Sequence, residues 1–162
     1  MIVNKNHITK KLSLLILMIF NYSCIAQVNK INSNESTINS ISYLGNNVSF
    51  VIQDFDQPNT IEDYYYEIED VMSKKYIYND ILFYIIDDTV DSFEITGGNY
   101  LFTNNNIKIG DNIQNLNSFY PISFANKNSE ALYLDFNDID MHIIISYNSF
   151  NNLIDKIAIY SY

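Results

Sequence analysis

Short runs of β-branched and aromatic residues, separated by brief polar breaks, constrain the fold of this chain more than any other feature. Such runs are typical of β-strands, and turn residues such as Asp87-Asp88-Thr89 separate them. No helical stretch lies between consecutive runs, so the crossovers of a parallel sheet are not expected. The sequence predicts strands at residues 64–69, 75–79, 81–86, 90–96, 100–103, 132–136, 139–147 and 153–160.

Two short helices are expected to lie on this sheet. Apolar residues recur at helical spacing in residues 46–55 and again in 111–120, with an Asn or Asp before each stripe as a cap. Pro58 and Pro121 are expected to end the two helices. Helices this short do not persist alone in water, so they must pack on the strands. The predicted fold class is α+β with an antiparallel β-meander.

The same order of elements occurs twice along the chain. Gly45 and Gly110 lie 65 residues apart, as do Val48 and Ile113. Preserved order over several positions indicates an internal duplication. We therefore predict two tandem units, residues 38–99 and 100–162, each a short helix packed on an antiparallel meander.

This order resembles a known fold. The steps Leu44-Gly45 and Ile107-Lys108-Ile109-Gly110-Asp111, with the strand at residues 154–160, are similar to tandem β-lactamase-inhibitor-protein-like repeats. The single unit also occurs in small outer-membrane lipoproteins of the barrel-assembly machinery. The resemblance implies protein–protein binding on the exposed sheet face and carries over no catalytic residue. The disulfides of the inhibitor have no counterpart here.

The N-terminus has the features of a secretory signal peptide. Lysines precede the apolar residues 12–20, and small residues follow, so we expect residues 1–26 to be removed by cleavage after Ala26. Alternatively, Cys24 is lipidated and anchors the protein in the envelope, or the segment stays as an uncleaved anchor. Residues 27–37 are rich in Asn and Ser without apolar period, which predicts a flexible leader.

The charge of the chain favours a basic partner. The 162 residues carry 9 basic and 19 acidic side chains, a net charge of −10. After cleavage six lysines face 19 acidic residues, a net charge of −13, and no arginine or cysteine remains. Nucleic acid is excluded as a partner because phosphate binding needs clustered Lys and Arg. The absence of cysteine leaves stability to packing alone.

The segment around Tyr64-Tyr65-Tyr66 is the candidate binding site. Together with Glu67 and Glu69 it forms an acidic, aromatic strand, and tyrosine is enriched on binding surfaces. Alternation places Tyr64 and Tyr66 on one side, and Tyr65, Glu67 and Glu69 on the other. The plain alternative is a strand with one buried and one solvated face.

Catalytic groups are few after residue 26. His142 is the single histidine there, and no motif supplies a nucleophile beside it, so we interpret it as a half-buried strand residue. Acidic pairs such as Asp87 and Asp88 are expected by chance among 19 carboxylates. Residues 135–140, which include Asp138, are oxygen-rich, but they fail the EF-hand pattern for Ca²⁺ because Ile139 occupies a ligand position.

The sequence therefore predicts a secreted bacterial protein that binds another protein and is not an enzyme. We expect an inhibitor or immunity type of module for a basic partner, with no cofactor and no metal. A membrane association is expected only if Cys24 is lipidated, in which case the chain is an envelope scaffold.

Overall fold

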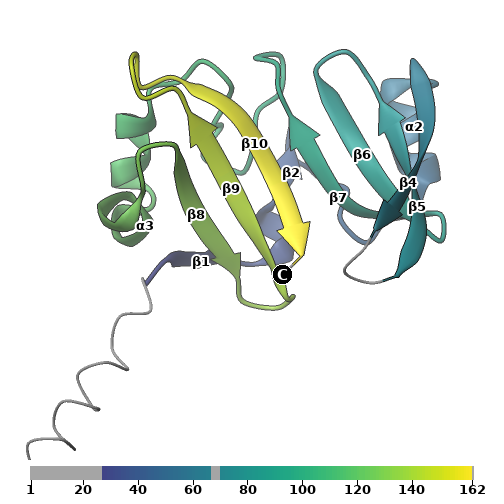
Figure 1. Cartoon of the computed structure of the whole chain (residues 1–162), viewed down its shortest axis with the longest axis horizontal. Coiled ribbons are helices and arrows are strands. Elements are labelled where there is room, and N and C mark those ends of the chain that lie inside the picture. Colours follow the sequence, from purple (N-terminus) through teal and green to yellow (C-terminus); the bar gives the residue numbers. More distant parts are fainter. Residues whose placement is uncertain (1–26, 67–69, 162) are drawn as a thin grey trace, which may run out of the picture.

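One sheet of eight strands dominates the computed structural model, which describes residues 27–66 and 70–161. The strand order is β1-β8-β9-β10-β7-β6-β5-β4 (Figure 1). A separate ribbon pairs β2 (Thr37–Ile38) with β3 (Ile41–Ser42). The strands of the main sheet are β1 (Asn29–Ile31), β4 (Thr60–Tyr66), β5 (Val71–Ile77), β6 (Ile81–Ile86), β7 (Thr89–Ile95), β8 (Ala131–Phe136), β9 (Met141–Tyr147) and β10 (Ile154–Ser161).

The sheet is mixed, because β1 runs parallel to β8 while the other pairs are antiparallel. Residues 27–37 were expected to be a flexible leader, and the structure corrects this: Asn29 pairs with Leu134, and Ile31 is buried. The Asn29 side chain also accepts hydrogen bonds from the amides of Ile122 and Ser123, each at 3.0 Å. Hydrogen bonds of the Asn29 side chain hold this strand together with the burial of Ile31, so a hydrophobic period does not reveal it.

The helices are short: the first lies where the sequence predicts it, whereas the second is a 3₁₀ helix that is followed by a helix the sequence did not predict. Helix α2 (Val48–Phe55) is capped by the Asn47 side chain, which accepts from the Ser49 amide at 3.0 Å. In the second segment a 3₁₀ helix, η2 (Ile113–Ser118), precedes α3 (Pro121–Asn126). Asn112, rather than Asp111, caps η2. Pro121 therefore begins a helix instead of ending one, as the missing N–H of proline permits.

The expectation of two tandem helix-on-meander units was wrong. All eight strands form one mixed sheet, and β10 lies between β9 and β7 at its middle. The two segments also differ in their helices, since one has α2 and the other has η2 followed by α3. Similar spacing of apolar residues arises in both segments because both must cover the same sheet, and this similarity produced the apparent repeat.

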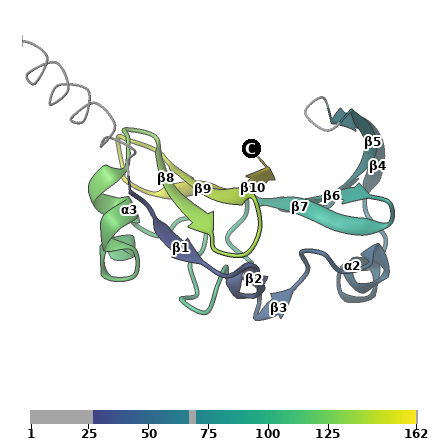
Figure 2. The same cartoon turned by 90° about the horizontal axis from the view of Figure 1, so that it is seen from below.

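The helices and the β2–β3 ribbon lie on one side of the sheet, as Figure 2 shows. The core fills this interface and centres on aromatic and branched residues with no exposed surface, such as Phe83, Phe93, Phe102, Ile143 and Ile157. Within the described residues, no helix covers the opposite face of the sheet (Figure 2). Strands β4 and β5 curl toward that open side, so the face is concave (Figure 2). Within the described residues no helix is long and apolar enough to cross a membrane.

Candidate functional site

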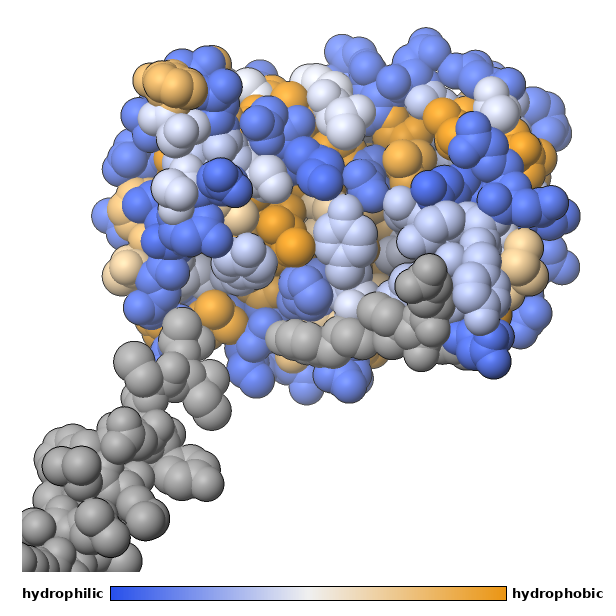
Figure 3. All heavy atoms as spheres, viewed as in Figure 1, coloured by the Kyte–Doolittle hydropathy of each residue, from blue (hydrophilic) through white to orange (hydrophobic). Residues whose placement is uncertain are grey.

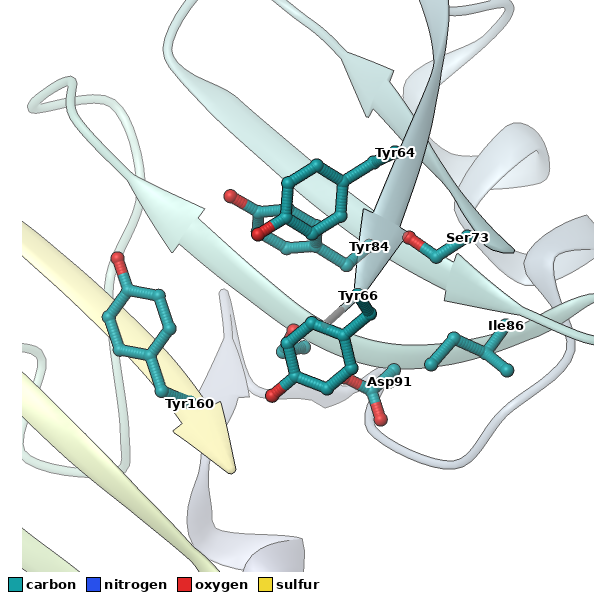
Figure 4. Close-up of a pocket in the computed structure, with 8 residues that line it drawn as sticks. Tyr64, Tyr66, Ser73, Tyr84, Ile86, Asp91 and Tyr160 are labelled. Atoms are coloured by element: carbon teal, nitrogen blue, oxygen red, sulfur yellow. The ribbon is translucent and has the colours of Figure 1, made fainter. Parts of the chain in front are cut away.

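A small pocket that opens to solvent, with about 30 Å³ of space for a water-sized group, lies on the concave face between β4, β5, β6, β7 and β10. Four tyrosines from three strands surround it, together with two serines, an isoleucine and a carboxylate (Figure 4). On this side of the molecule, hydrophilic residues and residues of intermediate hydropathy surround several smaller hydrophobic patches (Figure 3). The residues that line the pocket include Tyr64, Tyr66, Ser73, Tyr84, Asp91 and Tyr160.

Strand register explains why these side chains meet. Tyr64 on β4 is paired with Ser73 on β5, and paired residues of neighbouring strands point to the same face. Tyr84 on β6 is likewise paired with Ser92 on β7. The core-facing residues of β6 alternate with Tyr84, since Phe83 and Ile85 are buried under the helices.

A β-bulge adds Asp91 to this face. The pairs Tyr84–Ser92 and Ile85–Val90 are adjacent on β6, yet on β7 one additional residue, Asp91, lies between them. A bulge turns the extra side chain out of the regular alternation. Val90 and Phe93 are buried in the core, so both Asp91 and Ser92 border the pocket.

Glu94 organises the tyrosines at the β10 side. Its Oε1 accepts hydrogen bonds from the hydroxyls of Tyr84 at 2.9 Å and Tyr160 at 3.0 Å. The Lys156 Nζ lies 3.8 Å from Glu94 Oε2, and 3.4 Å from the Tyr160 hydroxyl. Burial, reinforced by the Glu94 carboxylate, raises the pKa of both phenols above the usual 10.0. Both hydroxyls therefore stay protonated and fix the ring positions at neutral pH.

Lysine ammonium groups already contact aromatic faces on this surface. The Nζ of Lys75 lies 4.3 Å from the centroid of the Tyr64 ring and 5.4 Å from that of Tyr84. These distances fall within the range of cation–π attraction. The Tyr64 and Tyr84 centroids are 5.4 Å apart, so the two rings form one continuous aromatic wall.

Two polar groups of the pocket are incompletely satisfied. Burial raises the pKa of the Asp91 carboxyl above 3.8, and a hydrogen bond with Ser92 opposes this effect. Asp91 forms no ion pair with any residue that the structure describes. The Ser73 side chain is 4% exposed, and its Oγ has no hydrogen-bond partner in the described part of the chain. Such groups are costly to leave unpaired.

The predicted binding residues are divided by the sheet. Tyr64 and Tyr66 line the pocket, whereas Tyr65 lies on the other face, is 49% exposed and donates a hydrogen bond to Asp70. Glu67 and Glu69 lie outside the described residues, as does Cys24. Sequence reasoning missed Tyr84, Asp91, Glu94 and Tyr160. Alternation with buried residues along each strand could have indicated that these side chains lie on the solvent face of the sheet. It could not have indicated that they lie close to one another.

His142 and the acidic residues 135–140 lie outside the lining of the pocket. The His142 ring is 6.3 Å from the Tyr160 ring, and burial lowers its pKa below 6.5 although Asp135 acts in the opposite direction. Asp138 accepts hydrogen bonds from the amide of Ser33 at 2.8 Å and from its hydroxyl at 2.7 Å, and these bonds lower the pKa of Asp138. Residues 27–66 and 70–161 contain no cluster of three His, Cys, Asp or Glu suited to a metal.

This architecture occurs in secreted bacterial proteins. No family model and no curated protein matches the chain by sequence. Among solved structures, an extracellular protein containing a SCP domain from Bacillus anthracis matches with a TM-score of 0.53, 13% identity, and coverage of 83% of this chain and 48% of that one. A cysteine-rich secretory protein from Staphylococcus aureus matches with a TM-score of 0.54, 10% identity, and coverage of 82% and 49%.

These matches concern the fold. The chain spans about half the length of each of the two structures. Their descriptions correct the resemblance to tandem β-lactamase-inhibitor-protein-like repeats, because both neighbours are SCP-domain or cysteine-rich secretory proteins. Both are also described as extracellular or secretory, which agrees with the expected secretion of this chain.

Proposed function

We propose that this chain is a secreted, non-catalytic binding protein whose concave sheet face receives a basic protein partner. The observation that carries the proposal is the tyrosine-lined pocket on a face of the sheet that no helix of the described residues covers. Tyrosine side chains give large contact area at low cost in conformational entropy. Their fixation by Glu94 further reduces the entropy lost on binding.

Charge supports a cationic partner. The chain beyond residue 26 has a net charge of −13, which attracts basic proteins and speeds their encounter. Lys75 and Lys156 already sit against tyrosines and Glu94, so the face is suited to ammonium groups. Secretion is supported by the signal-like N-terminus and by the extracellular neighbours.

The non-catalytic part of the proposal is supported by how the carboxylates are used. Glu94 is engaged by two phenols and a lysine, so it acts as a structural acceptor. His142 lies on β9, outside the pocket lining. A general base must reach the proton that it abstracts, and His142 is not among the residues that line the pocket with Ser73 and Ser92.

A capture experiment with matched variants tests the proposal. The chain from residue 27 is immobilised and exposed to the extracellular and envelope fractions of its host. We expect a basic protein to be retained at low salt and released by roughly 0.5 M salt, where charge interactions are screened. Tyr64→Ala should abolish retention and Tyr65→Ala, on the other face, should not. Retention that resists salt, or that depends on Tyr65 alone, contradicts the proposal.

A further inference from the structure

The pocket combines aromatic walls with a carboxylate, that of Asp91, which forms no ion pair within the described residues. We propose that it is an ammonium site that takes the side chain of a lysine presented by the partner, with Asp91 as counter-charge. The inference rests on the proposed function and names the chemistry that its central contact recognises.

The aromatic walls suit a cation. Tyr64, Tyr66 and Tyr84 stand close together, with centroids of Tyr64 and Tyr66 6.3 Å apart and those of Tyr64 and Tyr84 5.4 Å apart. Tyr160 faces them from β10 (Figure 4). Grouped aromatic faces attract ammonium groups, and the position of Lys75 over Tyr64 shows this attraction within the same wall.

Asp91 supplies the charge that a cation requires. Glu94 is balanced by Lys156, but Asp91 has no ion pair within the described residues. It is half-buried because the β-bulge directs it into this face. A partly desolvated carboxylate gains more from a cationic ligand than an exposed one, because water screens the attraction less. An anionic ligand, in contrast, meets repulsion here.

Ser73 provides a further acceptor. Its hydroxyl oxygen is buried, lines the pocket and lacks a partner among the described residues (Figure 4). An ammonium group has three N–H donors, which the carboxylate of Asp91 and the hydroxyl of Ser73 can accept. The pocket has about 30 Å³ of space for a water-sized group, which admits a single small group such as an ammonium and is too small for a sugar ring.

The test uses two small probes on the chain from residue 27. Nα-acetyl-lysine N-methylamide is titrated by NMR, and the norleucine equivalent, which lacks the ammonium group, serves as the neutral control. We expect saturable shifts at Tyr84 and Asp91 with the lysine probe and none with the norleucine probe. Asp91→Asn should weaken lysine binding about 10-fold, as loss of a charge-assisted contact does.

Two further variants control for charge and folding. Asp63→Asn removes the same charge from β4, where Asp63 pairs with Lys74 and is exposed away from the pocket, so binding should not change. Ser73→Ala deletes a buried hydroxyl without a partner, so the protein should keep its stability while lysine binding weakens about threefold.

The outcomes separate this inference from the proposed function. Equal response to both probes, full binding by Asp91→Asn, or preferential binding of an N-acetylglucosamine oligosaccharide overturns the ammonium site. The lysine probe could fail to bind while a basic partner is still captured in a salt-sensitive and Tyr64-dependent way. In that case the assignment of the pocket as an ammonium site is wrong and the proposed function stands. If both fail, the proposed function is wrong as well.

Discussion

The hydroxyl of Tyr66, at the end of β4, forms a hydrogen bond with the hydroxyl of Ser161, at the end of β10. Strands β5, β6 and β7 lie between these two strands in the sheet. A flat sheet cannot bring them together, so the contact records the curl that makes the open face concave. The pocket exists because of this curl.

Tyr66→Phe is expected to loosen the curl. The variant keeps the ring and removes the hydroxyl that meets Ser161, and a hydrogen bond of this kind contributes about 0.5–1.5 kcal/mol. Urea unfolding should show a loss of that size, and hydrogen exchange should increase in β4 and β5. Tyr65→Phe, on the other face, is the control and should leave exchange in these strands unchanged.

Removal of the Glu94 carboxylate should destabilise the whole face. Glu94→Ala leaves the hydroxyls of Tyr84 and Tyr160 without their acceptor, so the free energy of unfolding should fall by about 1–3 kcal/mol. Glu94→Gln keeps an acceptor oxygen and should lose less. Glu130→Ala, at an exposed position, is the control, and an equal loss in that variant would contradict the role of Glu94.

Gly45 should tolerate asparagine better than alanine. Its φ is +72°, and a side chain added there meets no atom within 4 Å, so strain arises from the backbone alone. Left-handed conformation costs most residues about 1–2 kcal/mol, whereas asparagine adopts it more readily. Thermal unfolding should therefore rank the variants as wild type, Gly45→Asn and Gly45→Ala. A clear stability gain with alanine would contradict this backbone conformation.

Stability should decrease as the pH falls from about 7.5 to 5.5, partly because of His142. Burial lowers its pKa in the folded protein below the ordinary 6.5, so the unfolded chain takes up the proton first. Protonation then favours unfolding, and stability present above about pH 6.5 is lost on acidification. Urea unfolding of His142→Gln should show a smaller difference between the two pH values. An unchanged difference would assign the effect to other groups.

Secretion predicts the mass of the mature protein. Cleavage after Ala26 leaves a chain that begins at Gln27, and Cys24→Ser should change neither its mass nor its release into the soluble fraction. Intact mass spectrometry after fractionation of the host measures both. A chain that begins at Cys24 and carries acyl groups in the membrane fraction would instead support the envelope scaffold.

Local pattern predicted the individual elements well. Strand β6 covers residues 81–86 as expected, and alternation correctly separated Tyr64 and Tyr66 from Tyr65. The expected strand at residues 100–103 proved to be a loop with isolated bridges at Phe102. The correct predictions depend on hydrophobic periods of two residues for strands and 3.6 residues for helices, which short windows of sequence contain.

Long-range relations could not be read in this way. Strand β1 pairs with β8 and is also held by the Asn29 side chain, which accepts hydrogen bonds from the distant amides of Ile122 and Ser123, and neither relation leaves a hydrophobic period. Asp91 enters the pocket through a bulge, and Tyr160 through the curl of the sheet, which residue spacing does not encode. Tyr64 and Tyr66 were therefore found, but Asp91, Glu94 and Tyr160 were not.

The central position of β10 has a consequence for the order of folding. β10 is the last of the described strands along the chain, yet β9 and β7 both pair with it. Until it is in place, β4–β7 and β8–β9 are two separate groups of strands without a shared sheet. Contacts between distant segments slow folding because loop closure must precede them. Such a chain completes its sheet only after β10 is available, so the joining of the two halves is expected to follow the formation of the local hairpins within β4–β7 and β8–β9.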